Sequence, residues 1–211
     1  GIKPKYYFIS ASGNKKKFSK LNLSKISNSL YDEQKKYKII LSGGDTVFSN
    51  KLSFTITSIG YGNDIVYRNK AKINDDIYVS GNLGDSYLGL LVLKRKINLN
   101  SKLLDRYFIN HYFMPNIQLK LSNKIQKFAN TSIDISDGLL ADLDKMINDQ
   151  KLSYKIFLKD IPISNNLKKI LNLKKLSKIN YISKGDDYQV LFTAPKNNRR
   201  IIKRLASNYR I

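Results

Sequence analysis

The 211-residue sequence predicts an α+β (mixed α/β) protein built in two parts. Short β-branched runs alternate with stretches of helical apolar spacing along the whole chain. Three of the predicted strands adjoin turns that combine aspartate with glycine, at residues 42–46, 134–138 and 185–188. Between residues 61 and 75 the sequence is polar and irregular, which indicates a boundary between the two parts.

The first part, residues 1–67, is expected to begin in the order strand, helix, strand, strand. The apolar side chains of Leu21, Ile26 and Leu30 have helical spacing. Residues 52–61 alternate instead in the manner of a strand. The predicted elements are a strand at 5–11, a helix at 21–36, a strand at 38–42 that enters a turn at Gly43 and Gly44, and a strand at 52–61.

The second part, residues 68–211, is expected to form an α/β domain in which strands and helices alternate. The glycine-containing turn at residues 81–86 precedes one helix, and Pro115 stops another. The predicted strands are 76–80, 132–135, 154–158 and 188–193, and the predicted helices are one ending near 94, then 102–112, 117–128, 139–148, 165–173 and a last one from 196.

The residue types present restrict the chemistry and the location. Cysteine is absent and His111 is the single histidine, which excludes thiolate sites and an imidazole cluster for zinc. A metal bound here must have oxygen ligands, which favours Mg²⁺. No apolar stretch approaches the ~18 residues that span a membrane, and no signal segment opens the chain. We therefore expect a cytoplasmic protein without membrane contact.

The formal charge of +22 raises the possibility of a nucleic-acid partner. Lysines outnumber arginines 31 to 7 and are spread along the chain, which indicates a compositional bias rather than a binding surface. A nucleic-acid-binding module would gather arginines and aromatic residues on one face. Most of the tyrosines and phenylalanines lie in apolar-periodic stretches, so we expect no nucleic-acid partner, with a basic, non-enzymatic binding module as an alternative.

Carboxylates are scarce, and their positions are informative. Of 16 acidic residues, fifteen are aspartates, and five of these lie in glycine-containing turns beside strands: Asp45, Asp134, Asp137, Asp186 and Asp187. Aspartates and glycines at strand ends favour binding of divalent cations and phosphates. The alternative is that aspartate and glycine serve here as ordinary turn and cap residues.

Five motifs in one order carry a family resemblance. They are Gly-Ile-Lys-Pro at 1–4, Ser-Gly-Gly-Asp-Thr at 42–46, Ser-Gly-Asn-Leu-Gly-Asp-Ser at 80–86, Ile-Asp-Ile-Ser-Asp-Gly-Leu-Leu-Ala-Asp-Leu at 133–143, and Gly-Asp-Asp-Tyr-Gln-Val-Leu-Phe at 185–192. Together they resemble the thiamine-monophosphate kinases, a branch of the larger family that includes aminoimidazole ribonucleotide synthetase and selenophosphate synthetase. The motifs extend over nearly the whole chain.

The resemblance implies a two-domain synthetase-like kinase fold and transfer of the γ-phosphate of ATP to thiamine monophosphate. Such transfer needs cations that bring phosphates together and neutralise their charge, which suits a set of aspartates. The resemblance implies Mg²⁺ at Asp45, Asp134 and Asp137, ATP contacts from Gly44, Asp45, Arg68 and Ser136, and a substrate contact from Asp186, where the family has a glutamate.

The family's members also carry sequence before the point that matches Gly1 and a final strand region after Ile211. We therefore expect a chain truncated at both ends, with residues 1–67 as the remnant of an ATP-binding and dimerisation domain. The resemblance implies a homodimer for the complete protein and little activity for this chain alone. Another ATP-using synthetase of the same superfamily is the alternative, disfavoured because no cysteine nucleophile is present.

Overall fold

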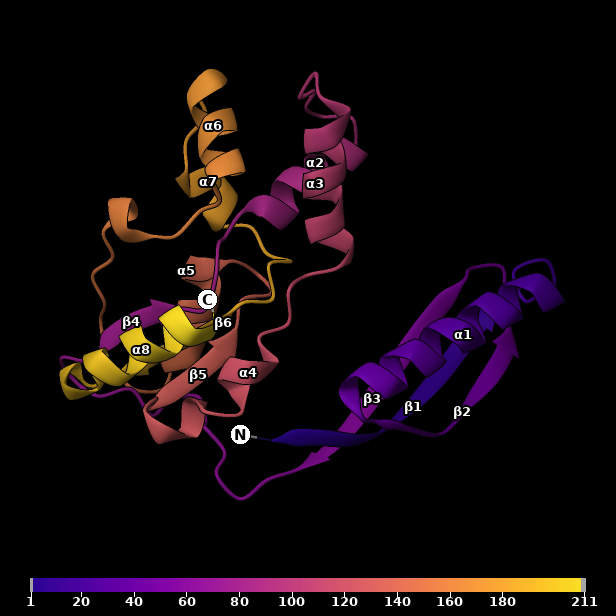
Figure 1. The fold of residues 1–211 in the computed structure, drawn as a ribbon, viewed down its shortest axis with the longest axis horizontal. Helices are drawn as coiled ribbons and strands as arrows, with labels where there is room; N and C mark the ends of the chain where they lie inside the picture. Colours follow the sequence, from indigo (N-terminus) through magenta and orange to yellow (C-terminus); the bar gives the residue numbers. More distant parts are fainter. Residues whose placement is uncertain (1, 210–211) are drawn as a thin grey trace. The chain divides into compact units, whose positions relative to one another are not determined.

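The computed structural model describes residues 2–209, and the chain divides into two compact units, Gly1–Ile65 and Val66–Ile211 (Figure 1). Each unit has its own three-stranded sheet and its own helices. The presence of helices and a sheet in both units confirms the predicted α+β class. In the part of the chain that the structure describes, no helix is long and apolar enough to cross a membrane.

The first unit is a strand-helix-strand crossover followed by a third strand that pairs antiparallel with the first. Its elements are β1 (Lys3–Gly13), α1 (Lys20–Tyr37), β2 (Ile40–Phe48) and β3 (Ser53–Tyr61). The strand order is β2-β1-β3, with β2 parallel and β3 antiparallel to the central β1. Ser19 caps α1 by accepting a hydrogen bond from the backbone N–H of Asn22, and the order matches the predicted one.

The prediction of a turn at Gly43 and Gly44 is wrong, because β2 runs through both glycines to Phe48. The pairing of β1 with β2 shifts register at this point, so that Tyr7 faces Leu41 and Phe8 faces Gly43. Glycine is required here for close approach of the strands: a Cβ on Gly44 would lie 1.8 Å from the carbonyl oxygen of Ile9. The glycines therefore serve a β-bulge inside a strand rather than a turn.

The first unit has little core of its own. Among its described residues, Tyr7 is the one large apolar side chain that is buried, and α1 buries none. Apolar side chains of β2 and β3 are open to solvent instead, with Phe48 72%, Ile56 59% and Val47 53% exposed. An apolar surface of this kind is typical of a contact area for further polypeptide.

The second unit is built on an antiparallel sheet with the order β4-β6-β5. Its strands are β4 (Asp76–Val79), β5 (Thr131–Asp134) and β6 (Val190–Ala194). Its helices are α2 (Asp85–Leu93), α3 (Lys102–Phe113), α4 (Leu119–Ser122), α5 (Leu139–Ile147), α6 (Asn165–Leu173), α7 (Ile179–Ile182) and α8 (Arg199–Tyr209), with short 3-10 turns η1 (Ile125–Lys127), η2 (Leu158–Asp160) and η3 (Lys196–Asn198).

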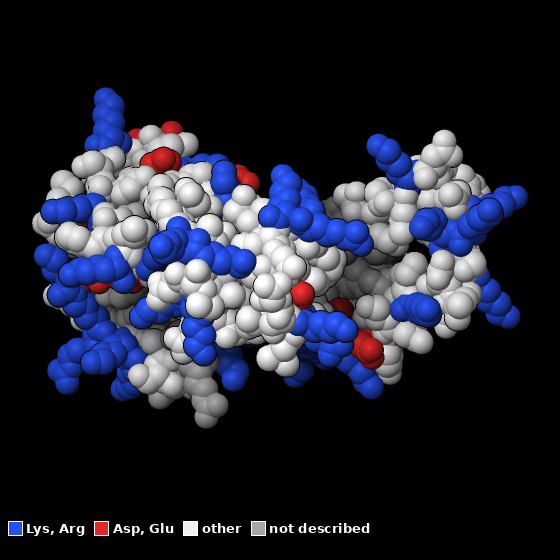
Figure 2. All heavy atoms as spheres, turned by 90° about the horizontal axis from the view of Figure 1, so that it is seen from above, with Lys and Arg blue, Asp and Glu red and all other residues white. Residues whose placement is uncertain are grey.

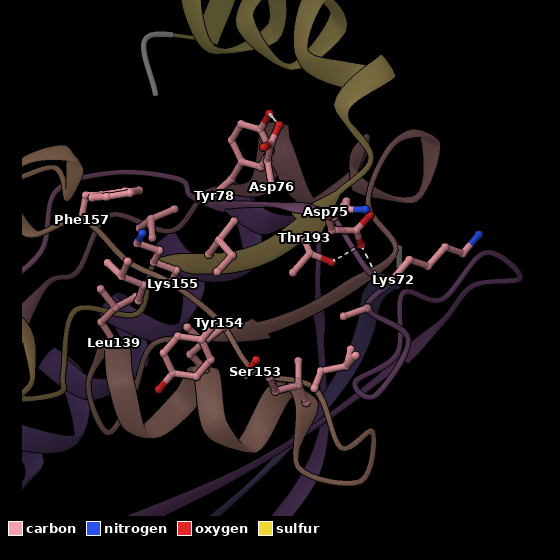
Figure 3. Close-up of a pocket in the computed structure, with 18 of the residues that line it drawn as sticks. Lys72, Asp75, Asp76, Tyr78, Leu139, Ser153, Tyr154, Lys155, Phe157 and Thr193 are labelled. Atoms are coloured by element: carbon pink, nitrogen blue, oxygen red, sulfur yellow. Dashed lines mark hydrogen bonds between the residues drawn. The ribbon is translucent and has the colours of Figure 1, made fainter.

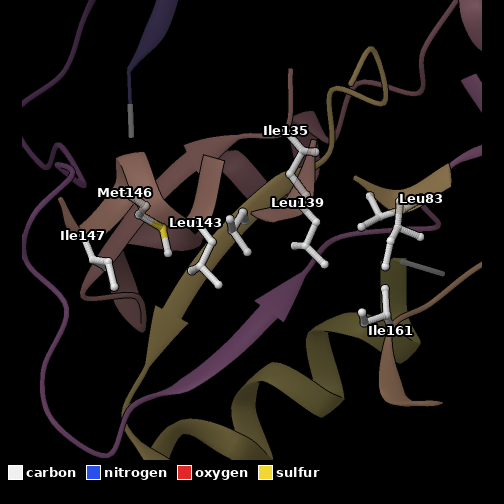
Figure 4. Packing of buried hydrophobic residues seen from close by; sticks show 9 residues of the cluster. Leu83, Ile135, Leu139, Leu143, Met146, Ile147 and Ile161 are labelled. Carbon is white, nitrogen blue, oxygen red and sulfur yellow. The ribbon is translucent and has the colours of Figure 1, made fainter. Parts of the chain in front are cut away.

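The central strand β6 has a core on both faces. Leu191 packs in one cluster with Leu143 and Met146 of α5 (Figure 4). The next residue, Phe192, points to the opposite face, as alternation along a strand requires, and packs in a cluster with Ile202 of α8. The helices α2, α3 and α6 share a third cluster. The sheet thus lies between α5 and α8, and this packing fixes where β5 ends and α5 begins.

Two predicted elements of the second unit differ from the structure. The helix expected at 117–128 forms only the short α4 and η1, because Ser122 bonds back to the carbonyl of Leu119 and the helix stops at Asn123. The strand expected at 154–158 is extended but belongs to neither sheet, and its end enters η2. Residues 152–157 alternate between partly buried and exposed as a strand would, but within the described residues no strand pairs with them.

Basic side chains cover the surface widely. Figure 2 shows Lys and Arg distributed over the visible face without a single continuous patch. The arrangement agrees with their even spread along the sequence.

Candidate functional site

The acidic turn between β5 and α5 presents two carboxylates to solvent. β5 ends at Asp134 and α5 begins at Leu139, so the connection contains Ser136 and Asp137. Both aspartates are exposed, and Ser136 is half-buried between them. Ile135 is fully buried and anchors the turn in the core. The turn therefore has a backbone anchored in the core and exposed carboxylate oxygen atoms, which a cation site requires.

Asp142, in the first turn of α5, holds this connection in shape. Its side chain is 1% exposed, and its Oδ2 accepts hydrogen bonds from the backbone N–H groups of Asp137 at 2.8 Å and Gly138 at 3.0 Å. A buried carboxylate that accepts two backbone N–H groups satisfies donors that the helix start would otherwise leave unpaired. Asp142 thereby orients the segment that carries Asp137.

A second acidic turn docks directly on the first. The backbone N–H of Asp186 donates to the carbonyl of Ser136 at 2.9 Å, and that of Tyr188 donates to the carbonyl of Ile135 at 2.8 Å. Asp186 and Tyr188 adopt left-handed conformations, with φ of 68° and 50°. A Cβ on Gly185 would lie 1.7 Å from the carbonyl oxygen of Ser136. Left-handed non-glycine residues persist only where the surroundings enforce them, and they cluster at functional sites.

The charges of the two turns act on one side chain, Tyr188. Burial raises the pKa of Tyr188, and the negative charges of Asp186, Asp134 and Asp137 raise it further. The carboxylates of both turns therefore act electrostatically on the same tyrosine. The structure thus brings four of the predicted site residues together, namely Asp134, Ser136, Asp137 and Asp186.

A lysine neutralises part of this acidic cluster. Lys145 of α5 forms an ion pair with Asp137 and donates to Oδ1 of Asp142 at 3.0 Å. The two carboxylates raise the pKa of Lys145. The ammonium group of Lys145 therefore competes with a divalent cation for the carboxylate oxygen atoms of Asp137.

Asp187 ties the second acidic turn to the start of α2. Asp187 is buried, and its carboxylate accepts from the backbone N–H of Gly84 at 2.8 Å and of Ser86 at 3.4 Å, at the start of α2. The neighbouring Asp85 is also buried and accepts from the hydroxyl of Ser164 at 2.7 Å. These bonds tie the 185–188 turn to α2, so Asp187 is a structural cap rather than an exposed ligand.

The pKa of Asp187 predicts a pH dependence for the second unit. Burial is the main cause that raises this pKa from 3.8 to about 7, and the charge of Asp85 adds to the shift. Because the folded pKa lies above the unfolded one, this contribution to stability is full below pH 3.8 and is lost as the pH rises through about 7. We expect this group to make the unit less stable at pH 8 than at pH 4 by up to about 4 kcal/mol.

Hydrogen exchange of the Leu88 amide in α2, followed against pH, measures this effect. The variant Asp187→Asn should lose most of the slope, whereas Asp105→Asn, on α3, should retain it. An unchanged slope in Asp187→Asn would assign the dependence to other groups.

The other predicted residues lie elsewhere. Gly44 and Asp45 belong to β2 of the first unit, where Asp45 is exposed and its Oδ1 accepts from the N–H of Thr46 at 2.7 Å. Arg68 is exposed in the second unit. The next residue, Asn69, lies at the C-terminal end of α5, because its backbone N–H donates to the carbonyl of Met146 at 2.7 Å. About 13 Å of helix separates that end from the acidic turn.

The donor set within the second unit fits part of a magnesium site. Asp134 and Asp137 supply hard, exposed oxygen atoms, which is the chemistry that Mg²⁺ prefers. Over residues 2–209 the structure has no group of three or more His, Cys, Asp or Glu side chains placed to hold a metal ion. Mg²⁺ bound here would take its remaining ligands from water and phosphate oxygens, as is usual for this ion.

Two contributors were not predicted from the sequence, namely Asp142 and Lys145. Asp142 lies five residues after Asp137, a spacing that allows a helix-borne carboxylate to reach back to the preceding turn. Lys145 follows Asp142 by three residues, the usual spacing of an ion pair on a helix. Asp187 was recognised as part of an acidic turn, but its capping of α2 had no local signal, because its partners are about a hundred residues away.

The chain was compared with known proteins. No protein-family model matches it. It is 38% identical to the thiamine-monophosphate kinase of Buchnera aphidicola subsp. Acyrthosiphon pisum, over 83% of this chain and 54% of that protein. It is 35% identical to that of Aquifex aeolicus, over 76% of this chain and 52% of that protein.

Solved structures of thiamine-monophosphate kinases are also similar to this chain. The thiamine-monophosphate kinase of Stenotrophomonas maltophilia superposes with a TM-score of 0.87 at 28% identity, covering 99% of this chain and 66% of that one. AaThiL complexed with AMPPCP and TMP superposes with a TM-score of 0.84 at 30% identity, covering 93% and 63%. HypE of E. coli, at 16% identity, has a TM-score of 0.78 over 98% and 64% and shares the fold alone.

The chain thus has the α+β fold that HypE and the thiamine-monophosphate kinases of known structure share. Within that group, its sequence is similar to those of the thiamine-monophosphate kinases. It spans about half the length of the first curated relatives that it matches.

Proposed function

We propose that the protein transfers the γ-phosphate of ATP to thiamine monophosphate, which gives thiamine diphosphate. The observation that carries the proposal is the docking of the 185–188 turn on the 134–138 turn through two backbone hydrogen bonds, which brings the segment that carries Asp186 beside the one that carries Asp134 and Asp137. The relation to AaThiL, which was solved with AMPPCP and TMP, supports the choice of nucleotide and acceptor.

The proposed roles follow the chemistry of each side chain. Mg²⁺, when bound, would bridge phosphate oxygens and neutralise the charge that develops during transfer. Asp45 of the first unit would hold Mg²⁺ against the ATP phosphates, and Asp134 and Asp137 of the second unit would hold further Mg²⁺. Ser136 would donate a hydrogen bond to ATP, and Gly44 would let the backbone of β2 approach the nucleotide.

Two further roles are proposed for Arg68 and Asp186. Arg68 would contact ATP as a bidentate phosphate ligand. Asp186, where the resemblance places a glutamate, would contact thiamine monophosphate. No protein base is needed, because the acceptor is a phosphate oxygen that is already ionised.

The proposal includes a homodimer and a cytoplasmic location. The exposed apolar side chains of β2 and β3 support the homodimer, because a surface of this kind is typical of a contact between subunits. The cytoplasmic location follows from the use of ATP. Light scattering of the purified protein against concentration checks the dimer.

Magnesium-dependent formation of thiamine diphosphate from ATP and thiamine monophosphate by the complete protein tests the activity, since little is expected of the 211-residue chain alone. The expected product is thiamine diphosphate with one ADP for each molecule formed, and none when magnesium is replaced by a chelator. Phosphorylation of other acceptors at equal rates would refute the substrate assignment.

Lys145 provides a prediction for the cation site. The variant Lys145→Met should bind Mn²⁺ about fivefold more tightly at low salt, because it removes a positive charge beside Asp137. Titration followed by electron paramagnetic resonance measures the affinity. Lys203→Met, an exposed change on α8, should leave it unaltered. Equal affinities in the wild type and Lys145→Met would show that Asp137 is not a ligand.

A further inference from the structure

Lys145 lies on the side of α5 that faces the first acidic turn. Another side of the helix carries Leu139 and Leu143, which line a groove of about 1170 Å³ beside β4 (Figure 3). Because a residue two positions after Leu143 is turned by about 200° around a helix, Lys145 points away from this groove. Its ammonium group contacts Asp137 and Asp142 instead.

The two carboxylates that hold Lys145 differ in exposure. The side chain of Asp142 is 1% exposed and that of Asp137 is 63% exposed. An ion pair at the surface contributes little to stability, whereas removing the partner of a buried charge is costly. The contact with Asp137 is therefore the one that breaks readily, and the contact with Asp142 keeps the ammonium group beside the turn.

Asp142 has both oxygen atoms engaged inside the protein. Its Oδ2 accepts from the backbone N–H groups of Asp137 and Gly138, and its Oδ1 accepts from Lys145 at 3.0 Å. Asp142 is thus a support for the turn and for the ammonium group rather than a ligand for an external cation. An ammonium group has three N–H donors, and in the described structure the two carboxylates account for two of them.

A phosphate group bound at Asp137 lies within reach of Lys145. Ligand distances around Mg²⁺ are about 2.1 Å, so a phosphate oxygen that shares the ion with Asp137 is within about 4 Å of the carboxylate oxygen. Lys145 contacts that carboxylate, and its flexible four-carbon stem allows the ammonium group to turn from one oxygen atom to the other.

We propose that Lys145 is a phosphate-binding residue of this site, an inference that rests on the function proposed above. Before the phosphate binds, Lys145 neutralises Asp137. When Asp137 becomes a ligand of Mg²⁺, Lys145 keeps its bond to Asp142 and donates to an oxygen of the bound phosphate. Its positive charge then lies where negative charge spreads over the phosphate oxygens during transfer. The phosphate is that of the nucleotide or that of thiamine monophosphate.

An ordinary ion pair on a helix is the alternative, because Asp142 and Lys145 are three residues apart on α5. Such a pair affects the stability of the helix but not the affinity for a phosphate. The proposal instead requires Lys145 to act in opposite directions on two ligands: it weakens binding of the metal ion alone and strengthens binding of the phosphate that follows.

Binding of Mn²⁺ alone, and then of a phosphate compound at saturating Mn²⁺, separates the two effects. With Lys145→Met, Mn²⁺ alone should bind the chain more tightly. The complete protein loaded with Mn²⁺ should bind AMPPCP or thiamine monophosphate at least about tenfold more weakly. Titration calorimetry with each compound shows which of the two phosphates Lys145 contacts. Lys203→Met, which removes a positive charge from an exposed position on α8, should change neither affinity.

Hydrogen exchange of the Leu191 amide shows whether the variant is folded. If it is not, Lys145→Gln, which removes the charge but keeps an N–H donor for Asp142, serves instead. Unchanged or tighter binding of both phosphate compounds by the variant would overturn the inference and leave the proposed function standing. If the complete wild-type protein bound neither compound in the presence of Mn²⁺, the proposed function and this inference would fail together.

Discussion

Replacing Asp142 with alanine is expected to destabilise the second unit by about 3–5 kcal/mol and to disorder the turn that carries Asp137. The change leaves the N–H groups of Asp137 and Gly138 without an acceptor and removes one of the two carboxylates that contact Lys145. Hydrogen exchange of the Leu143 and Leu191 amides, converted to a free energy of opening, measures the loss.

The matched control for this change lies on the same helix. Asp144 is exposed and accepts one hydrogen bond, from the hydroxyl of Tyr154 at 2.8 Å. Asp144→Ala should cost less than about 1 kcal/mol. If Asp142→Ala were no more destabilising than Asp144→Ala, the buried carboxylate would not be what holds the turn.

Gly185→Ala is expected to separate the two acidic turns. The new Cβ would lie 1.7 Å from the carbonyl oxygen of Ser136. The atoms that it meets belong to the backbone, so they cannot move aside as the end of a flexible side chain could. We expect a loss of about 3 kcal/mol or more, with large chemical-shift changes at the amides of Asp186 and Tyr188. The adjacent exposed change Lys184→Ala should leave these amides in place. Unchanged shifts in Gly185→Ala would contradict the docking.

Local signals in the sequence were sufficient for much of the second unit. The apolar spacing of α5, the β-branched run of β5 and the aspartates between them predicted the junction where the candidate site lies. The same holds for the 185–188 turn. What could not be predicted was their contact, because residues 136 and 186 meet through backbone bonds across fifty positions of sequence.

The errors have specific physical causes. Gly43 and Gly44 were assigned to a turn because glycine permits turns, but it also permits a bulge and a close approach between strands, and the sequence does not distinguish these uses. Residues 154–158 have the alternation of a strand, yet pairing depends on a neighbour that the pattern does not identify. Asp187 was recognised as part of an acidic turn, but its capping of α2 depends on the tertiary fold.

The binding of Mn²⁺ in the presence of AMPPCP tests the central claim most directly, because it examines the carboxylates without requiring turnover. Electron paramagnetic resonance should show that the nucleotide analogue and the ion strengthen each other's binding to the chain. The double variant Asp134→Asn with Asp137→Asn should weaken Mn²⁺ binding by about 100-fold or more, since partners of metal ligands alone are worth about 10- to 100-fold. Equal Mn²⁺ affinity in the wild type and the double variant would contradict the account.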